Sequence, residues 1–298
     1  MSFAIVYVTG RADPRLDWLI DGIEEQGIES DQIELIVVDA RGRPAREIGF
    51  RSIRPISRLV ETRPKPCVWQ GSQRVTSVDS WALSNARNTG IALCRSDYVV
   101  FIDDRCRIGE RWTRTVRRGI RERASVLAGT YDKREPGLHG VGTRVTIDHR
   151  LELKPDGLVN CGGGWLYGCS MALPLEWCLE VNGFEEGCDS LSGEDYIFGL
   201  MLANAGRRVD FVPDLRVHQD RMPQDGHGMR RTDKGTSPRD KSHAALERFG
   251  RRSRTEFTPD LRKMRDDLAS GGTFPDVDRS ADHLDWFDDQ PIRDLTLT

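Results

Sequence analysis

Three short apolar runs that each stop at polar or acidic residues restrict the fold of this chain more than any other feature. Phe3-Ala-Ile-Val-Tyr-Val8 stops at Thr9-Gly10, and Glu34-Leu-Ile-Val-Val-Asp39 ends in an acid. Tyr98-Val-Val-Phe-Ile102 is followed directly by Asp103-Asp104. Continuous apolar runs of this length are typical of strands that are buried on both faces. The sequence therefore predicts an α/β fold with a mostly parallel central sheet.

Helical patterns separate these strands. Apolar residues recur at helical spacing from Leu16 to Ile23, and Pro174 to Val181 has a proline at its first position. Asp79 or Ser80 is predicted to cap a further helix that runs through Ala92. Strands that alternate with helices give a Rossmann-like sheet flanked by helices, and ligands of such sheets bind beyond the carboxyl ends of the strands. The acids at the strand ends should therefore face one crevice.

Composition excludes several classes of protein. The 298 residues contain 44 Lys and Arg against 47 Asp and Glu, so a net charge of −3 gives no general attraction to nucleic acid or anionic membranes. The seven cysteines form no CxxC pair, and the chain opens on a strand rather than a secretory leader, which predicts a cytoplasmic protein. No apolar run approaches the roughly 20 residues that span a bilayer.

Charge patterning divides the chain into three parts. We predict a main α/β domain over residues 1–225, a basic helical extension over 226–268 and an acidic, flexible tail over 269–298. Residues 230–265 carry twelve Lys and Arg against five Asp and Glu, whereas residues 266–298 carry two Arg against nine Asp.

Less regular segments complete the expected organisation. Ser125 to Thr130 is predicted as a strand, followed by an irregular stretch to about Asn160. Within the basic extension, Lys241 to Phe249 and Pro259 to Leu268 are predicted as helices.

Acidic residues and one histidine carry the candidate chemistry. Asp103 and Asp104 offer carboxylate oxygens, which hard cations such as Mg²⁺ and Mn²⁺ prefer, although aspartate is also common at turns. Glu194 and Asp195 precede an amphipathic stretch, so they either serve a site or stabilise a helix N-terminus. His218 follows an apolar strand pattern, where an imidazole could complete a metal site or lie on the surface.

Taken in order, seven segments resemble the family 2 glycosyltransferases of the GT-A fold. The matching segments span about residues 3 to 220, and their order and spacing carry the resemblance more than any one of them does. They are Phe3-Ala-Ile-Val-Tyr-Val8, Ile36-Val-Val-Asp39, Ala86-Arg-Asn-Thr-Gly90, Val100-Phe-Ile-Asp-Asp104, Gly168-Cys-Ser-Met-Ala172, Val181-Asn-Gly-Phe184 and Gly193-Glu-Asp195.

The resemblance implies a nucleotide-diphosphate sugar donor, with UDP-sugars favoured. Thr9 and Asp39 would contact the nucleoside, with Asp39 facing the base. Arg87 would lie near the donor phosphates, and Asp103 would hold the ribose side.

The resemblance also implies how the sugar is transferred. A divalent cation, Mn²⁺ or Mg²⁺, would neutralise the departing diphosphate, held by Asp104 with His218 as a further ligand. Asp195 would be the general base that activates the acceptor hydroxyl, with Glu194 beside it for orientation, and the reaction would invert the anomeric carbon.

Two departures from the family pattern bear on the donor site. Arg105 stands where many relatives carry a third acid, and we expect it to pair with the diphosphate and partly replace the cation. The first strand ends in Thr9-Gly10-Arg11 rather than the Pro-x-Tyr-Asn of many relatives.

A sugar nucleotidyltransferase is disfavoured, because Gly10-Arg-Ala-Asp13 is a poor match to a glycine-rich phosphate loop.

The acceptor is not specified by these motifs. Trp165 and Trp69 either stack on a sugar or belong to the core. The expected acceptor hydroxyl belongs to a saccharide, a lipid head group at a membrane surface, a protein or a hydroxymethylated DNA base. DNA would dock through the basic segment from Arg230 to Arg265, which otherwise is a solvated helical face. A catalytically degenerate protein that only binds a nucleotide or glycan is the alternative function.

Overall fold

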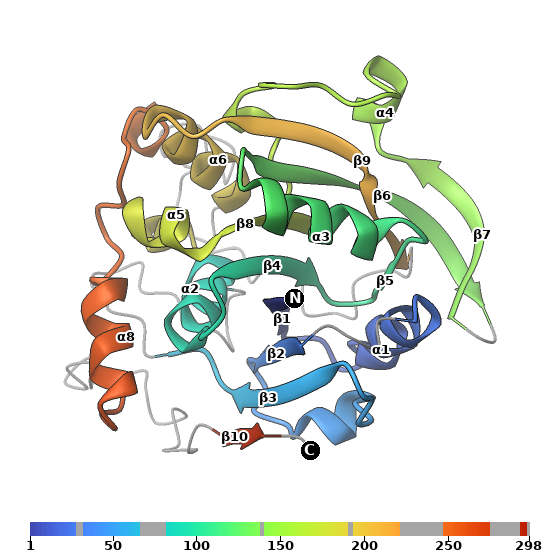
Figure 1. Ribbon diagram of the computed structural model, residues 1–298, viewed down its shortest axis with the longest axis horizontal. Coiled ribbons are helices and arrows are strands. Elements are labelled where there is room, and N and C mark those ends of the chain that lie inside the picture. Colours follow the sequence, from blue (N-terminus) through green and yellow to red (C-terminus); the bar gives the residue numbers. More distant parts are fainter. Residues whose placement is uncertain are drawn as a thin grey trace, which may run out of the picture.

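The computed structural model describes residues 1–27, 32–65, 82–137, 140–189, 193–220, 247–274 and 293–296. A curled sheet runs through the molecule and helices cover both of its faces (Figure 1). The strands are β1 (Ser2–Thr9), β2 (Gln32–Asp39), β3 (Ile56–Thr62), β4 (Tyr98–Asp103), β5 (Cys106–Ile108), β6 (Val126–Gly137), β7 (Gly140–Ile147), β8 (Ser170–Pro174), β9 (Val209–Asp220) and β10 (Arg293–Thr296). The helices are α1 (Leu16–Glu25), η1 (Ala45–Ile48), α2 (Leu83–Leu93), α3 (Trp112–Glu122), α4 (His149–Leu153), η2 (Gly163–Trp165), α5 (Leu175–Glu180), η3 (Glu186–Cys188), α6 (Glu194–Asn204) and α8 (Leu261–Ala269).

The sheet has the strand order β10-β3-β2-β1-β4-β8-β6-β9-β5, with β7 paired to β6. The strands β3, β2, β1 and β4 are parallel to their neighbours in this group, and β9 is parallel to β6. The strand β8 lies antiparallel between β4 and β6, and β5, β7 and β10 are antiparallel to their partners. The α/β class with flanking helices is confirmed, and its continuous parallel part is the N-terminal half of the sheet.

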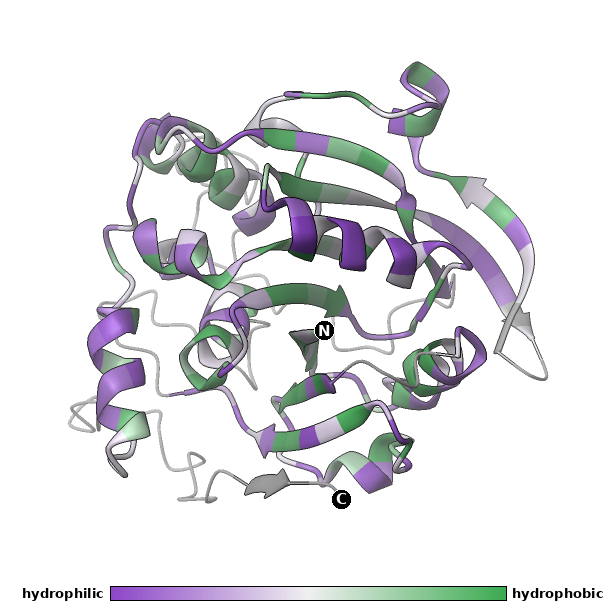
Figure 2. Ribbon diagram, in the orientation of Figure 1, coloured by the Kyte–Doolittle hydropathy of each residue, from purple (hydrophilic) through white to green (hydrophobic). Residues whose placement is uncertain are grey.

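Strand alternation divides the core into two layers. Along β1, Ala4, Val6 and Val8 pack with apolar residues of α2, α5, α6 and α8. The intervening residues Phe3 and Tyr7 pack on the other face with residues of α1 and α3. Because both faces are covered, the central strands are apolar throughout, as the hydropathy colouring shows for β4 (Figure 2).

Two local predictions differ from the structure. The stretch expected to be irregular up to Asn160 contains the end of β6 and the strand β7, which form an antiparallel pair. This pair is rich in charged residues and lacks the apolar run that marks the central strands. The helix expected to begin at Asp79 or Ser80, which lie outside the described residues, begins at Leu83.

The N-terminus of α2 is stabilised by a residue far away in the sequence. The backbone N–H groups of Ser84 and Asn85 donate to the carboxylate of Asp189 at 2.7 and 3.2 Å. Asp189 is almost fully buried, and burial followed by the nearby Glu186 raises the pKa of its carboxyl. A helix start that sequence reasoning assigned to a local cap therefore depends on a contact between distant segments.

The C-terminal extension packs on the main domain in its described part. The helix predicted over Pro259 to Leu268 is confirmed as α8, which lies against α2. Of the helix predicted over Lys241 to Phe249, residues 247–249 are helical and the rest lies outside the described residues. In the acidic tail, residues 269–274 are described together with β10, which pairs with β3 at the edge of the sheet. Among the described helices, none is long and apolar enough to cross a membrane.

The side chain of Asn182 fastens this extension to the domain. Its amide nitrogen donates to the hydroxyl of Thr255 at 2.9 Å and to the carbonyls of Thr258 and Pro259, each at 3.0 Å. Its amide oxygen accepts from the backbone N–H of Leu261 at 2.9 Å. Asn182 also adopts a positive φ of 62°, which asparagine tolerates better than most residues. The Val-Asn-Gly-Phe segment of the sequence therefore connects the C-terminal extension to the rest of the protein through hydrogen bonds of Asn182.

We expect Asn182→Ala to lower the free energy of unfolding by about 2–3 kcal/mol, because it leaves several buried polar groups without partners. Asn204→Ala is the matched control, since Asn204 also donates to two backbone carbonyls but is exposed to water. Urea unfolding of both variants checks this. An equal decrease in the free energy of unfolding of the two variants would contradict this role of Asn182.

Candidate functional site

A buried arginine joins three elements at the carboxyl end of β4. Arg87 of α2 is 1% exposed, and its guanidinium donates to Asp103 at the end of β4 at 2.8 Å and to Glu194 at the start of α6 at 2.7 Å. Burial opposes the charge of Arg87, but Asp103, Glu194 and Asp195 outweigh it and raise the pKa of the guanidinium. Three residues predicted separately from the sequence are therefore in direct contact.

Close backbone packing places these three elements. A Cβ atom on Gly168 would lie 2.2 Å from a guanidinium nitrogen of Arg87, and one on Gly90 would lie 2.3 Å from the side chain of Val6. A Cβ atom on Gly163 would lie 2.1 Å from the carbonyl oxygen of Gly199 in α6. Glycine at these positions lets η2 approach α6 and lets α2 approach β1. The glycine-rich segment before β8 thus shapes the site.

Asp195 is a half-buried carboxylate next to this cluster. Its Oδ2 accepts from the backbone N–H of Gly168 at 2.8 Å, and its Oδ1 accepts from the backbone N–H of Tyr196 at 2.7 Å. Burial and the neighbouring charge of Glu194 raise the pKa of Asp195 to about 6. A carboxylate with this pKa accepts a proton far more readily near neutral pH than an ordinary aspartate does.

Asp104 faces the opposite side of the strand from Asp103. Its Oδ2 accepts from the hydroxyl of Thr9 at 2.7 Å, and its Oδ1 accepts from Nε of Arg11 at 2.9 Å. Burial raises the pKa of Asp104 to about 6, although Arg11 and Thr9 oppose this shift. Because side chains alternate along a strand, the two adjacent aspartates belong to different groups of contacts.

Asp39 organises the turn that follows β2. It is 1% exposed and accepts from the backbone N–H of Arg41 at 2.9 Å and from Nε of Arg43 at 2.8 Å. The guanidinium of Arg43 continues to the carbonyls of Arg11 and Ala12 at 2.6 and 2.7 Å. Asp39 and Thr9 are paired across β1 and β2, so the loops after both strands form one surface beside Asp104.

Arg105 lies beside these loops and forms ion pairs with Asp13 and Asp220. It adopts a positive φ of 57° and is 7% exposed. Its Nε donates to Asp220 at the end of β9 at 2.9 Å, and its NH1 donates to the carbonyl of Asp13 at 2.8 Å. The guanidinium predicted to pair with a diphosphate thus holds the end of β9 against the loop after β1.

The predicted metal ligands Asp104 and His218 contact different residues in the structure. The described residues contain no group of three or more His, Cys, Asp or Glu that could hold a metal ion. Nδ1 of His218 lies 2.7 Å from Asp132, and this contact and Arg134 lower the pKa of Asp132 to about 2 although burial opposes the shift. Both oxygens of Asp104 already accept hydrogen bonds.

Asp103 suits a cation better than Asp104 does. Its side chain is 26% exposed, and the bond to Arg87 uses Oδ1 only. Mg²⁺ and similar ions commonly use one or two protein carboxylates together with substrate phosphates and water. Asp103 can therefore supply one carboxylate oxygen to a cation.

Two aromatic residues belong to α6 and to η2, which packs against it. Trp165 is half-buried and its ring centroid is 5.2 Å from that of Phe211. Tyr196 is 37% exposed, and a Cβ atom on Gly164 would lie 2.9 Å from its ring, so this tyrosine covers the glycine-rich segment. Trp69 lies outside the described residues.

The described arginines of the basic extension mostly contact acids or carbonyls. Arg248 pairs with Glu256 at 2.6 Å and Arg252 pairs with the same carboxylate at 3.2 Å. Arg262 pairs with Glu176, and Arg265 donates to the carbonyl of Cys94 at 2.6 Å. Residues 230–246 of this segment lie outside the described residues.

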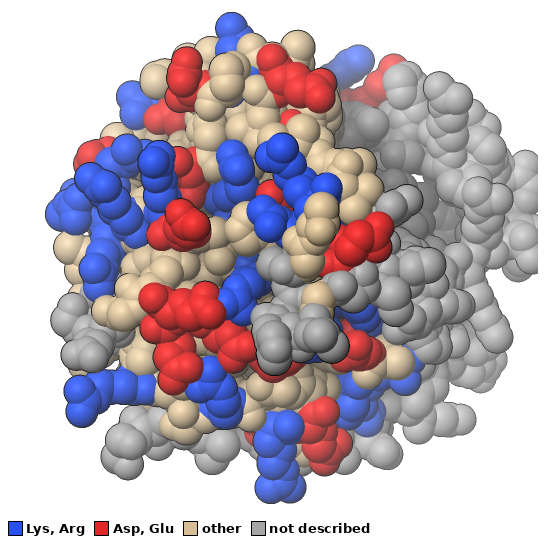
Figure 3. Space-filling view, turned by 90° about the vertical axis from the view of Figure 1, so that its right-hand side faces the viewer, with Lys and Arg blue, Asp and Glu red and all other residues tan. Residues whose placement is uncertain are grey.

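Sequence reasoning missed three residues of the site. Arg11 contacts Asp104, Gly168 contacts both Arg87 and Asp195, and Tyr196 is exposed next to Asp195. Gly168 begins one of the recognised segments, and a glycine before a strand was the available signal. Figure 3 views the side toward which β4 points, where acidic and basic side chains lie close together beside residues that are not described.

Comparison with solved structures identifies the fold. The chain resembles the crystal structure of GalNAc-T7 with UDP, GalNAc and Mn²⁺ at a TM-score of 0.52 and 13% identity, covering 83% of this chain and 48% of that one. Structures of S. aureus TarS 1–349 follow at TM-scores of 0.47 alone and 0.49 with UDP, with 14% and 15% identity over 74% and 75% of this chain. These matches cover 60% and 61% of the TarS chains.

The fold is therefore the GT-A fold of glycosyltransferases. The chain spans less than two thirds of the length of each of these solved chains. No protein-family model matches the sequence, and no curated protein matches it.

We expect Arg87→Met to lower the free energy of unfolding by about 3–5 kcal/mol, because it leaves carboxylates uncompensated in a buried site. Arg51→Met is the matched control: Arg51 also bridges two acids, Asp21 and Glu24, but on the surface, so we expect a much smaller loss. Denaturant unfolding of both variants measures the difference. A loss for Arg87→Met no greater than that of the control would contradict the central role of Arg87.

Proposed function

We propose that this protein is a glycosyltransferase that uses a nucleotide-diphosphate sugar, with UDP-sugars as the favoured donors. The observation that carries the proposal is the position of Asp195, a carboxylate with a pKa of about 6 beside the Arg87 cluster at the carboxyl end of β4. In a GT-A fold, this end of the parallel strands is where a donor would bind. A base and a diphosphate-binding region then lie next to each other.

We propose roles for the two aspartates after β4 that differ from those the resemblance implies. Asp104 shares contacts with Thr9 and Arg11 and adjoins Asp39, so we assign it to the nucleoside side of the donor. Asp103 is partly exposed and contacts Arg87, so we assign it to the diphosphate and cation side. His218 has no part in this cation site, and Arg105 acts by positioning the loops rather than by contacting the donor.

The charges of the cluster favour a divalent cation. Arg87 is one positive charge among three carboxylates, those of Asp103, Glu194 and Asp195. A diphosphate placed here would add further negative charge to a half-buried site, which is unfavourable without a counterion. When bound, Mn²⁺ or Mg²⁺ would neutralise the departing diphosphate.

Asp195 performs the proton transfer in this mechanism. A carboxylate oxygen of Asp195 accepts the proton of the acceptor hydroxyl, and the hydroxyl oxygen attacks the anomeric carbon of the donor sugar. The bond between that carbon and the diphosphate oxygen breaks, and the nucleoside diphosphate leaves with the electron pair. A single in-line displacement inverts the anomeric carbon. The backbone N–H of Gly168 fixes one oxygen of Asp195 and thereby orients the carboxylate.

We propose that the acceptor binds over the aromatic residues near Asp195. Tyr196 is exposed and directly adjoins the base, and Trp165 lies in the segment that packs on the same helix. Aromatic rings commonly stack on the apolar faces of sugars. A saccharide acceptor fits this surface, and a hydroxymethylated DNA base is the second acceptor class under the same mechanism.

Donor turnover tests the proposal. We expect purified protein to release UDP from one of a panel of UDP-sugars with Mn²⁺, and to release much less with chelator. Asp103→Asn should raise the Mn²⁺ concentration needed for half-maximal release more than tenfold, whereas Asp104→Asn should mainly weaken donor binding. The measurement is UDP release against Mn²⁺ and donor concentration. No binding of any donor and no release would leave the degenerate glycan-binding alternative instead.

The pKa of Asp195 predicts the pH dependence of transfer. Because this pKa is raised to about 6, the carboxyl is protonated below pH 6 and cannot accept a proton, so kcat should rise with pH and level off above about 7. Asp195→Asn should lower kcat by at least 100-fold and leave donor affinity within about threefold, since general base catalysis contributes about 10²–10⁴-fold.

Asp156→Asn, which changes an exposed aspartate, is the matched control and should leave kcat unchanged. Initial rates from pH 5 to 9 check both expectations. A pH profile of kcat that is flat across pH 6 in the wild-type protein would argue against Asp195 as the base.

A further inference from the structure

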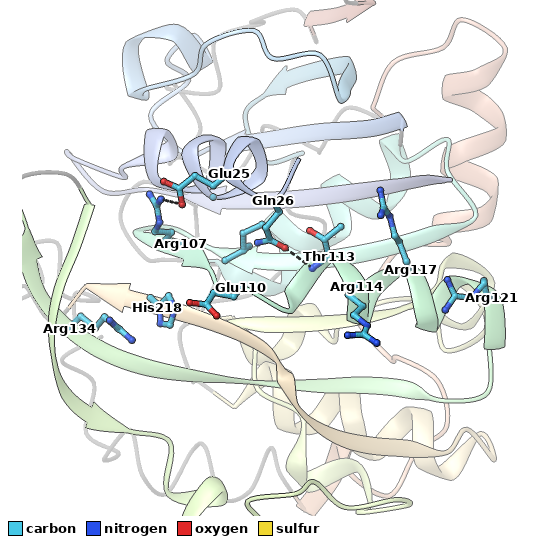
Figure 4. A pocket seen from close by; sticks show the side chains of 12 residues that line it. Glu25, Gln26, Arg107, Glu110, Thr113, Arg114, Arg117, Arg121, Arg134 and His218 are labelled. Carbon is cyan, nitrogen blue, oxygen red and sulfur yellow. Dashed lines mark hydrogen bonds and ion pairs between the residues drawn. The ribbon is translucent and has the colours of Figure 1, made fainter. Parts of the chain in front are cut away.

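A groove lined by arginines lies on the face of the sheet covered by α1 and α3. Its cavity has a volume of about 720 Å³, and Arg107, Arg114, Arg117, Arg121 and Arg134 line it together with Glu25, Glu110 and His218 (Figure 4). These residues come from α1, β5, α3, β6 and β9, and Glu110 lies between β5 and α3. None of the residues predicted to bind the donor lies on these elements. We name this cavity the α3 groove.

Two arginines of the α3 groove, Arg114 and Arg121, are not ion-paired among the described residues. Arg107 pairs with Glu25, and Arg134 pairs with Asp132 at 2.9 Å. Among the described residues, no ion pair or hydrogen bond is made by the side chains of Arg114 and Arg121, and both are exposed. The local positive charge contrasts with the net charge of −3 of the chain. In the view of Figure 3, Lys and Arg side chains gather along the left side of the molecule.

The arginines of α3 form one stripe along the helix. Arg114, Arg117, Arg118 and Arg121 follow the spacing i, i+3, i+4 and i+7, which places them on one helix face. With a rise of about 1.5 Å per residue, Arg114 and Arg121 are about 10 Å apart along the axis. Along one strand of a DNA duplex, phosphates follow each other every 3.4 Å or so of helix axis while they wind around it, so the stripe is long enough to face more than one phosphate.

The lining also indicates what the groove does not bind. The lining contains no Phe, Tyr or Trp. Proteins that bind single-stranded nucleic acid use such side chains to stack on the bases. The large apolar residues that are exposed in the described part of the chain are Met1, Leu153, Val159 and Tyr196, and none of them lies on α1 or α3. A membrane-inserting surface would need such residues. Guanidinium groups on a concave surface instead suit a ridge of phosphates.

We propose that the α3 groove binds the phosphate backbone of duplex nucleic acid without reading its sequence. The stripe on α3 contacts successive phosphates of one strand, and the ion-paired Arg107 and Arg134 form the wall opposite. This site is separate from the donor site and from the basic extension, whose described arginines mostly contact acids and carbonyls. The proposal concerns binding and does not depend on whether the protein transfers sugars.

Fluorescence anisotropy with a labelled 20-base-pair DNA duplex over a salt series tests this. We expect the wild-type protein to bind with log K falling linearly against log salt, and Arg114→Gln/Arg121→Gln to weaken binding at least tenfold in 50 mM salt. Each lost phosphate contact removes about 0.9 from the magnitude of the salt slope, so the slope should fall by about 1.8. Both side chains are exposed, so thermal unfolding should be unchanged.

The matched control is Arg54→Gln/Lys154→Gln, which removes the same charge from exposed positions outside both the α3 groove and the basic extension. It should bind the duplex within about twofold of wild type. The proposal is overturned if the wild-type protein does not bind the duplex in 50 mM salt, or if the control loses as much affinity as the groove variant. Tighter binding of the single strand, of polyglutamate-coated beads or of phosphatidylserine vesicles than of the duplex also overturns it.

Discussion

Burial of the Arg87 guanidinium among carboxylates is the constraint on which the rest of the site depends. A charged group can be buried only when opposite charges and hydrogen bonds replace its water. Asp103 and Glu194 supply them from β4 and α6, while Gly168 leaves the space that the guanidinium needs. These contacts offset the cost of removing Arg87 from water. They also fix the positions of α2, β4 and α6 relative to one another. The position of Asp195, one residue after Glu194, follows from this packing.

Alternation along β4 explains why two adjacent aspartates acquire different surroundings. Phe101 packs on the face with α2, and Ile102 packs on the face with α1 and α3. Asp103 continues the first series and meets Arg87, whereas Asp104 continues the second and meets Thr9 and Arg11. From the sequence, both acids were expected in one crevice because both follow the same strand. That expectation did not take into account that successive side chains of a strand point to opposite faces. As a result, water reaches the carboxylate of Asp103, whereas that of Asp104 is buried.

The sequence predicted the features that depend on local pattern. The apolar runs defined β1, β2 and β4, and the acids at their ends were placed at the correct edge of the sheet. Contacts between distant segments were not predictable in this way: nothing near Arg105 in the sequence indicates that its guanidinium turns to Asp220, more than a hundred residues later. The same holds for His218, whose partner Asp132 lies on a neighbouring strand rather than near the carboxylates of β4. Side-chain pairing across a curled sheet depends on register, which a single sequence does not show.

The bond between Asp189 and the start of α2 has a consequence for how the chain acquires its structure. The helix that carries Arg87 is completed by a carboxylate that is synthesised about a hundred residues later. Until that segment arrives, the first N–H groups of α2 have only water as a partner, and the helix is marginal at this length. Contacts of such long sequence separation form late, because the intervening loop must first close. A chain that ends before Asp189 therefore lacks the carboxylate that completes α2, and the Arg87 cluster can form only after Asp189 and Glu194 have been synthesised.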